Sequence, residues 1–324
     1  MNKDQYSNNK NMYTYLCMEE STISIFSQPW WLNSIVGEDN WDVCVVEKNG
    51  QVIASMPYVM KNKLGFKLCS MPKLTQTLGP WIRPSTAKYA NQLSRQKKLM
   101  NELIKQLPAY SYFLQKWHYS QTNWLAFYWQ GFQQTTAYTY VIDDLSDLDK
   151  VWSGFRENIR CDIRKASNRF NLIIDNQSTI NDFLQLNKQV FSRQNKDLPY
   201  SEEFITNLDC TLRENKASKI FIAVDDKGQK YAGVYLIWDK KSAYYLMGGG
   251  DPELRSSGAT SLCMWEAIKF ASTVTNKFDF EGSMIKPVEC FFRAFGARQV
   301  PYFIITKTPS ILLRLRMAML LLKD

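Results

Sequence analysis

The feature that most limits the fold of this chain is an internal repeat, in which one hairpin pattern occurs twice about half a chain apart. Residues 41–60 predict two strands around a turn at 48–50, and residues 219–238 predict the same arrangement around 226–228. The matching runs are Gly50-Gln51-x-x-Ala54-Ser55 in the first copy and Gly228-Gln229-x-x-Ala232-Gly233 in the second.

A second match follows each hairpin. The run Gly131-Phe132-x-Gln134 precedes a predicted strand at 138–142, and Gly296-Ala297-x-Gln299 precedes one at 302–305. Two matches in the same order indicate a duplication, so we expect two similar domains. A chain of 324 residues with 45% hydrophobic residues is long enough for both. An acidic, polar stretch near 143–149 marks the boundary, which gives domains at 1–145 and 146–308 and a C-terminal helix at 309–324.

The second half has a readable αβ order. Apolar residues spaced three or four apart over 152–170 predict one amphipathic helix, and Ser201 caps the start of another. After the hairpin, a strand over 243–247 ends at the three glycines 248–250. A loop to Gly258 leads into a helix, and a short strand follows at 277–280. This order predicts an α/β class with mixed α+β sheets.

Composition excludes several kinds of site. His118 is the only histidine, and the seven cysteines lie far apart without a CxxC pair, so we predict no metal site and no Ser-His-Asp triad. The formal charge of +9 favours acidic partners, such as the phosphates of a cofactor, a nucleotide-linked acceptor or RNA.

The loop before the predicted helix at 259 is a candidate anion site. Backbone amides at a helix start and a nearby arginine attract phosphate, although an ordinary surface turn has the same composition. The candidates are Arg255, Ser256, Ser257, Gly258, Ala259 and Thr260. The corresponding loop of the first half, 78–84, contains two prolines, which lack backbone donors, so it is poorly suited to phosphate.

Basic residues on the helix over 152–170 are candidates for binding an acidic substrate. Arg160 and Arg164 lie on one helix face beside Lys165. Such a row repels itself unless an anion or carboxylates lie against it; the alternative is a solvated helix face.

Two carboxylates and an arginine near the end of the chain are candidate catalytic groups. Asp279 and Glu281 project from one side of a strand end, where burial would raise their pKa and make either a general base. Either could instead cap the turn or pair with Arg293. Arg293 lies among Phe291, Phe292 and Phe295, and we expect a dry environment that strengthens its charge.

These motifs resemble the GNAT superfamily, and within it the Fem-type peptidyltransferases and related acetyltransferases with two fused GNAT domains. The resemblance rests on the runs Arg160-x-x-Ile163-Arg164-x-Ala166, Phe278-Asp279-Phe280-x-Gly282 and Phe292-Arg293-x-x-Phe295-Gly296. It implies two tandem GNAT-like domains with mostly antiparallel sheets flanked by helices, and an active site in the second. The chain departs from the family pattern at three positions. Arg293 stands where the family has Lys, and Glu281 stands where relatives often have Gly. The phosphate loop of the family ends on a small residue, and this chain has Thr260 at that position.

The resemblance implies an N-acyltransferase that moves an acyl or aminoacyl group from acyl-CoA, or alternatively from aminoacyl-tRNA, to an amine. The amine could belong to a cell-wall precursor, a polysaccharide or a small metabolite, and could be nucleotide- or phosphate-linked. Glu281 or Asp279 would accept the amine proton, Arg293 would steady the oxyanion, and the 255–260 loop would hold donor phosphate. Arg160, Arg164 and Lys165 would hold the acceptor or the tRNA. A non-catalytic RNA- or nucleotide-binding protein that keeps the fold is the alternative.

The two ends of the chain bear on its location. The first eleven residues lack an apolar run, which predicts no signal peptide or anchor and a cytoplasmic protein. Residues 311–322 are mostly Ile, Leu and Met, with Arg314 and Arg316 among them, but too few to span a bilayer. They predict a helix that lies on the inner membrane face or docks on a protein; packing onto the chain itself is the alternative.

Overall fold

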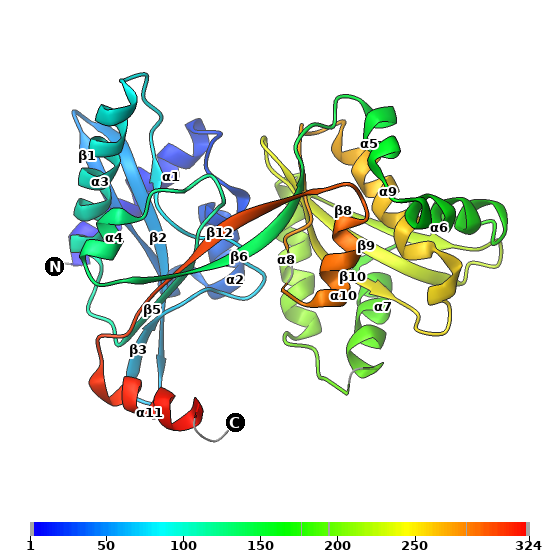
Figure 1. Cartoon of the computed structure of the whole chain (residues 1–324). Helices are drawn as coiled ribbons and strands as arrows, with labels where there is room; N and C mark the ends of the chain where they lie inside the picture. Colours follow the sequence, from blue (N-terminus) through cyan, green and yellow to red (C-terminus); the bar gives the residue numbers. More distant parts are fainter. Residues whose placement is uncertain (1–2, 176, 194, 283, 322–324) are drawn as a thin grey trace. The chain divides into compact units, whose positions relative to one another are not determined.

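A computed structural model describes residues 3–175, 177–193, 195–282 and 284–321, and they form two compact units (Figure 1). Unit 1 contains residues 1–137 and 301–324, and unit 2 contains residues 138–300. The sequence places a boundary at 145/146 and assigns the last predicted strand to the second domain. The structure instead assigns residues 301–307 to unit 1, where residues 304–307 pair with residues 113–116.

Unit 1 is a mixed sheet with helices. Its helices are α1 (Lys3–Glu19), α2 (Pro29–Val36), α3 (Tyr89–Gln106), α4 (Leu125–Trp129) and α11 (Ile311–Leu321). Its strands are β1 (Trp41–Lys48), β2 (Gln51–Lys63), β3 (Phe66–Cys69), β4 (Trp81–Ile82), β5 (Tyr112–Lys116) and the second half of β12 (Arg298–Lys307). Strands β1, β2 and β3 are antiparallel neighbours, β3 and β5 are parallel, and β12 pairs antiparallel with β5.

Unit 2 follows the same plan. Its helices are α5 (Leu148–Gly154), α6 (Glu157–Asn168), α7 (Ile180–Arg193), α8 (Glu202–Glu214), α9 (Ala259–Ala271) and α10 (Lys286–Arg293). Its strands are the end of β6 (Gln133–Ile142), β7 (Ile173–Asp175), β8 (Ser218–Val224), β9 (Lys230–Trp238), β10 (Ala243–Gly250) and β11 (Phe278–Asp279). Strands β8, β9 and β10 are antiparallel neighbours, β10 and β11 are parallel, and β6 pairs antiparallel with β11.

The two units therefore repeat one pairing scheme, as the duplication predicts. The hairpins at Gly50 and Gly228 are the β1–β2 and β8–β9 hairpins, and each contains a register shift shortly before its turn. The terminal strands are exchanged, however. Strand β6 starts in the first half of the chain and completes unit 2, whereas β12 comes from the second half and completes unit 1.

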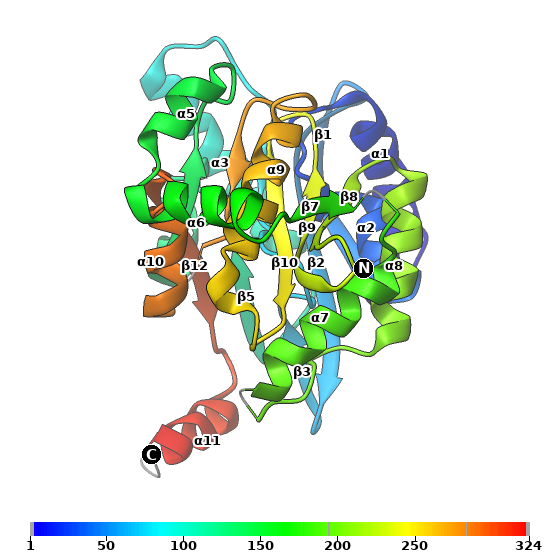
Figure 2. The same cartoon turned by 90° about the vertical axis from the view of Figure 1, so that its right-hand side faces the viewer.

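Both faces of the unit 2 sheet are covered by helices. On β9, Ala232, Val234 and Leu236 join the core that contains α9, while Tyr235 on the opposite face meets Phe183 of α7 with ring centroids 5.7 Å apart. Figure 2 shows α5, α6, α9 and α10 on one side of this sheet and α7 and α8 on the other. These helices cover the two faces of the sheet, and the candidate site lies at the ends of strands β10 and β11.

Three local predictions differ from the structure. The stripe over 152–170 forms two helices instead of one, because Phe155 is extended (ψ 142°) and the amide of Arg156 donates to the carbonyl of Ala294. The three glycines do not end β10, which runs through Gly250. The proline-containing loop of unit 1 includes β4, which pairs with β2.

Candidate functional site

Strands β10 and β11 separate from each other at the candidate site. They pair in parallel only at Ala243–Phe278 and Tyr244–Asp279, after which β10 continues to Gly250. Among the described residues, no strand pairs with β10 beyond Tyr244 on the side that faces β11. Parallel neighbours end at the same side of a sheet, so the end of β10 and the chain after Asp279 lie at one edge, with backbone donors and acceptors of β10 left for a ligand.

The glycines of β10 let two neighbours approach closely. A Cβ on Gly249 would lie 2.6 Å from the backbone nitrogen of Asn187 in α7, so only glycine allows this contact. The side-chain amide of Asn187 donates to the carbonyl of Gly248 (2.7 Å), and Tyr200 donates to its Oδ1 (2.8 Å). The end of β10 is thus fixed against α7, which predicts a rigid strand at the site.

The loop between β10 and α9 touches α6 at Gly258, which lies against the backbone of Asp162. Residues 255–257 form a short 3-10 turn, and Gly258 adopts φ +85° directly before α9. The Oγ of Ser257 accepts a hydrogen bond from the amide of Ala259 (3.2 Å), the first residue of α9, whereas Gly258 at the N-cap position has no side chain to cap the helix. This arrangement leaves the N-terminus of a 13-residue helix beside the end of β10, where its partial positive charge favours an anion.

A pocket of about 210 Å³ opens at this position. Of the six residues predicted to hold donor phosphate, Arg255, Ala259 and Thr260 line it, whereas Ser256, Ser257 and Gly258 shape the loop instead. Arg193 at the end of α7 also lines the pocket. Neither arginine forms an ion pair within the part of the chain that the structure describes. Asp251 lines the same pocket, so two guanidiniums and one carboxylate lie beside a helix N-terminus, and this excess of positive charge favours an anion.

The chain that leaves β11 carries the two predicted carboxylates. Asp279 is buried, and burial raises the pKa of its carboxyl to about 6. Its Oδ1 accepts hydrogen bonds from the hydroxyl of Thr139 and from the amide of Glu281 (2.8 Å). Glu281 has φ 64°, a conformation that this hydrogen bond supports, and its half-buried side chain has a buried Oε2. Asp279 therefore fixes the backbone on which Glu281 lies.

Arg293 lies in a different environment from the one predicted. It is exposed, and it forms an ion pair with Glu289 on its own helix (2.7 Å), which in turn accepts from Tyr140 (2.9 Å). These partners hold the pKa of Glu289 down at about 2. The expectation of a dry site was wrong because the surrounding aromatic residues turn inward: Phe292 packs on Phe280 of the strand end.

Helix α10 and Asp279 lie on opposite faces of β11. Phe278 belongs to the core on the α9 side and Phe280 contacts α10, so the intervening Asp279 points the other way. The structure therefore does not bring Arg293 and Asp279 together.

The basic row on α6 finds its counter-charges on the same helix. Arg160 pairs with Glu157 (2.6 Å), as does Arg164 (3.1 Å), and Lys165 pairs with Asp162 (3.3 Å). Arg164 also lies over the ring of Trp152 at 5.9 Å. The predicted self-repulsion is thus relieved without a ligand, and the substrate-binding role of this row stays a prediction.

The sequence prediction missed Arg193 and the helix that carries it. Local pattern gave no reason to select this arginine, since its position depends on the contact between α7 and Gly249. No cluster of three or more His, Cys, Asp or Glu side chains suited to a metal occurs within the described ranges.

Comparison with known proteins agrees with this architecture. Residues 153–282 match the family model of the acetyltransferase (GNAT) domain. A crystal structure of FemX superposes with a TM-score of 0.64 at 13% identity, covering 86% of this chain and 91% of its own. A tandem GNAT protein from the clavulanic acid biosynthesis pathway gives 0.51 at 11% identity, covering 95% and 97%. L-PGS from Bacillus licheniformis gives 0.53 at 10% identity, covering 95% of each chain.

No curated protein matches the sequence. The family match covers strands β10 and β11, the loop at 255–260 and the turn that carries Asp279 and Glu281. The structural matches extend over both units. Residues 153–282 thus match a GNAT acetyltransferase domain, and the chain as a whole has a fold similar to that of FemX and of the tandem GNAT protein.

Proposed function

We propose that this protein is an N-acyltransferase that takes an acyl or aminoacyl group from a phosphate-bearing donor and transfers it to an amine. The observation that carries the proposal is the pocket at the end of β10, where Arg193 and Arg255 meet the N-terminus of α9. Acyl-CoA is the proposed donor and aminoacyl-tRNA the alternative, since both carry phosphate groups. FemX and L-PGS share the fold, which supports aminoacyl transfer as the second option.

The proposed chemistry uses the open edge of β10 and the turn after β11. The amine nitrogen forms a bond to the carbonyl carbon, the carbon–sulfur or carbon–oxygen bond of the donor breaks, and the leaving group takes up a proton. Glu281 accepts the amine proton, directly or through a water, and Asp279 positions it through the backbone amide. Unpaired amides of β10 steady the oxyanion; a contribution from Arg293 stays a prediction.

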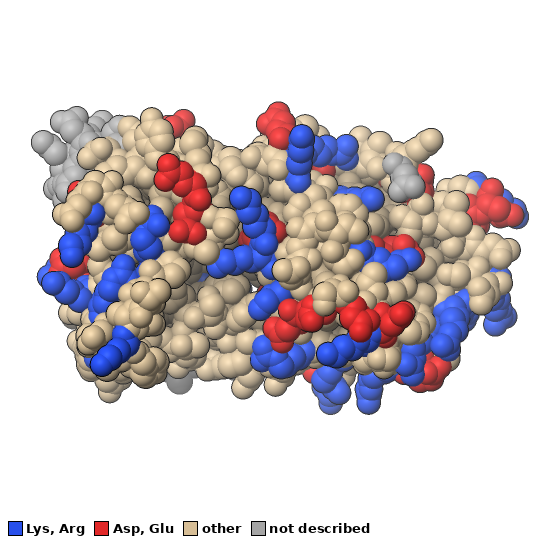
Figure 3. Space-filling view, turned by 90° about the horizontal axis from the view of Figure 1, so that it is seen from above, with Lys and Arg blue, Asp and Glu red and all other residues tan. Residues whose placement is uncertain are grey.

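The acceptor is proposed to be an amine on a cell-wall or polysaccharide precursor, nucleotide- or phosphate-linked, held by Arg160, Arg164 and Lys165. The rival function, non-catalytic RNA binding, has less support. On the face drawn in Figure 3, Lys and Arg alternate with Asp and Glu and form no continuous basic surface.

Donor binding tests the proposal. We expect acetyl-CoA or a charged tRNA to bind the full-length protein, and Arg193→Ala and Arg255→Ala each to weaken it about tenfold, as loss of a charge-assisted hydrogen bond does. Arg169→Ala is the matched control, because it removes an exposed arginine of the same unit that does not line the pocket. An equal loss in the control, or none in the two variants, would place the donor elsewhere.

Helix α11 supports a location at the inner membrane face. Its large apolar side chains are exposed, among them Ile311, Leu312 and Leu315, and the helix carries Arg314 and Arg316 but no acidic residue. None of the described helices is long and apolar enough to span a membrane. We propose that α11 inserts its apolar side chains among anionic lipids while both arginines reach the headgroups.

Vesicle flotation tests this location. The protein should float with vesicles that contain one third phosphatidylglycerol, and Leu312→Ser/Leu315→Ser should abolish flotation while leaving donor affinity unchanged. Arg314→Gln/Arg316→Gln should lose the preference for anionic over neutral vesicles. Concentration-dependent dimerisation lost in the same variants, without flotation, would show that a second copy covers the helix instead.

A further inference from the structure

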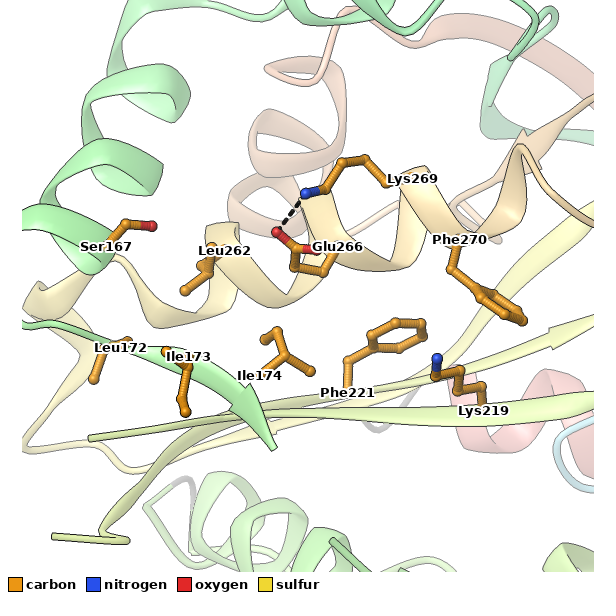
Figure 4. A pocket seen from close by; sticks show the side chains of 10 residues that line it. All are labelled: Ser167, Leu172, Ile173, Ile174, Lys219, Phe221, Leu262, Glu266, Lys269 and Phe270. Atoms are coloured by element: carbon orange, nitrogen blue, oxygen red, sulfur yellow. Dashed lines mark ion pairs between the residues drawn. The ribbon is translucent and has the colours of Figure 1, made fainter. Parts of the chain in front are cut away.

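A second, larger cavity lies in unit 2 away from the β10–β11 split. It has a volume of about 600 Å³ and lies between α9 and the β7–β8 edge of the sheet, with the end of α6 at one side (Figure 4). Small-molecule sites fall in the range of about 300–1,000 Å³. Its lining residues are Ser167, Leu172, Ile173, Ile174, Lys219, Phe221, Leu262, Glu266, Lys269 and Phe270.

The inner wall of this cavity is formed by the edge of the hydrophobic core. Leu172, Phe221 and Leu262 are buried members of the core cluster, and Ile174 and Phe270 pack against it. In Figure 4 the ring of Phe221 and the side chains of Ile174 and Leu262 lie between the helix and the strands, whereas Ile173 points away from them. An apolar group placed there would continue the core, which gives the cavity an affinity for hydrocarbon or aromatic surface.

One positive charge at the rim is uncompensated. Lys269 pairs with Glu266 at 2.7 Å, so their charges cancel. The Nζ of Lys219 instead lies 4.5 Å from the ring centroid of Phe270 and 5.2 Å from that of Phe221, and within the described ranges it forms no ion pair. The half-buried Lys219 thus presents an ammonium group at one end of an apolar cavity.

We propose that this cavity binds a small anionic amphiphile, a molecule with an apolar body the size of a medium-length acyl chain and one carboxylate or phosphate that meets Lys219. Charge selects the ligand, since a cationic amphiphile would face Lys219 without a counter-charge. The site shares no lining residue with the 210 Å³ pocket, although both contact α9. It is therefore a ligand site additional to that of the donor.

Calorimetry with decanoate below its micelle concentration tests the proposal on the full-length protein. We expect saturable binding of one decanoate at this site and none of decyltrimethylammonium. Lys219→Met keeps most of the aliphatic stem and should weaken decanoate about tenfold, the effect of removing one charge-assisted contact. Lys227→Met is the matched control, because Lys227 is an exposed lysine on the same hairpin that does not line the cavity.

Blocking and protection complete the test. Ser167 is exposed at the rim, so Ser167→Trp should obstruct the cavity and remove decanoate binding without changing donor affinity. Decanoate should also protect Lys219, but not Lys227, from acylation by an amine-reactive reagent in the unmodified protein. Absence of saturable binding, equal affinity in Lys219→Met, or equal reactivity of Lys219 with and without decanoate would overturn the proposal.

Discussion

The carbonyl oxygen of Asp162 in α6 lies so close to Gly258 that a Cβ on this glycine would stand 2.2 Å from it. Gly258 also has φ +85°, which side chains of L-residues rarely adopt. The loop at 255–258 is thus held between α6, which it touches, and α9, which follows it, and any side chain at 258 must displace one of these helices.

Gly258→Ala should therefore lower both stability and donor affinity. Gly228 is the matched control, because it has φ +77° but open space around its Cβ position. We expect Gly228→Ala to cost about 1–2 kcal/mol from backbone strain alone, and Gly258→Ala to cost about 1–3 kcal/mol more from the contact with Asp162. Urea unfolding and donor titration measure the two effects; equal destabilisation would contradict the contact.

Asp279→Asn should stabilise the protein at neutral pH. The carboxyl has a pKa of about 6 in the folded state and 3.8 ordinarily, so the folded state binds the proton more tightly. Ionised Asp279 therefore costs stability as the pH rises from 3.8 through 6. Asparagine keeps the Oδ1 acceptor, and its advantage should grow by about 1–3 kcal/mol between pH 4 and pH 7.5. An advantage that is independent of pH in unfolding experiments would be inconsistent with the buried carboxylate.

Glu281→Gln should lower turnover by about 10²–10⁴-fold if this carboxylate is the general base. Donor affinity should stay unchanged, because Glu281 does not line the donor pocket. Glu253→Gln provides the control, since it removes an exposed carboxylate from the loop after β10. Steady-state kinetics at pH 7.5 would exclude the role if both variants retained wild-type kcat.

Arg293→Ala separates a catalytic from a structural role. Loss of the ion pair should raise the pKa of Glu289 from about 2 towards its ordinary value of 4.5, which carboxyl NMR titration detects. If Arg293 also steadies the oxyanion, kcat should fall about a hundredfold. A loss smaller than about tenfold, with the Glu289 titration shifted as expected, would confine Arg293 to the surface ion pair.

Local chemistry explains what could be predicted from the sequence. The hairpins at Gly50 and Gly228 and the helix cap at Ser201 depend on residues next to one another, and the pattern revealed all three. The break at Phe155 could not be predicted, because the carbonyl that accepts the amide of Arg156 belongs to Ala294, far away in the sequence. The course of β10 through Gly249 likewise depends on α7, which the pattern did not identify.

The candidate site divides in the same way. The turn at 255–258 is a continuous segment, so its shape and the helix that follows could be predicted from the sequence, while its role in binding an anion stays a prediction. Arg193 reaches the pocket only through the packing of α7, and Arg293 is exposed because the Phe side chains around it fill the core. Spacing along the chain shows which residues are neighbours on one element, whereas it does not show which elements meet.

The exchange of β6 and β12 has a consequence for synthesis of the protein on the ribosome. The strands β6 to β11 of unit 2 precede residue 280, and only the first residues of β12 belong to this unit, so most of its sheet can form while translation continues. Unit 1 begins first, yet the strand that pairs with β5 lies at 304–307 and emerges after unit 2 is complete. Until residues 304–307 are synthesised, the edge of β5 that pairs with them stays uncovered. An uncovered strand edge can pair with other chains, so we expect the nascent first half to need protection by chaperones.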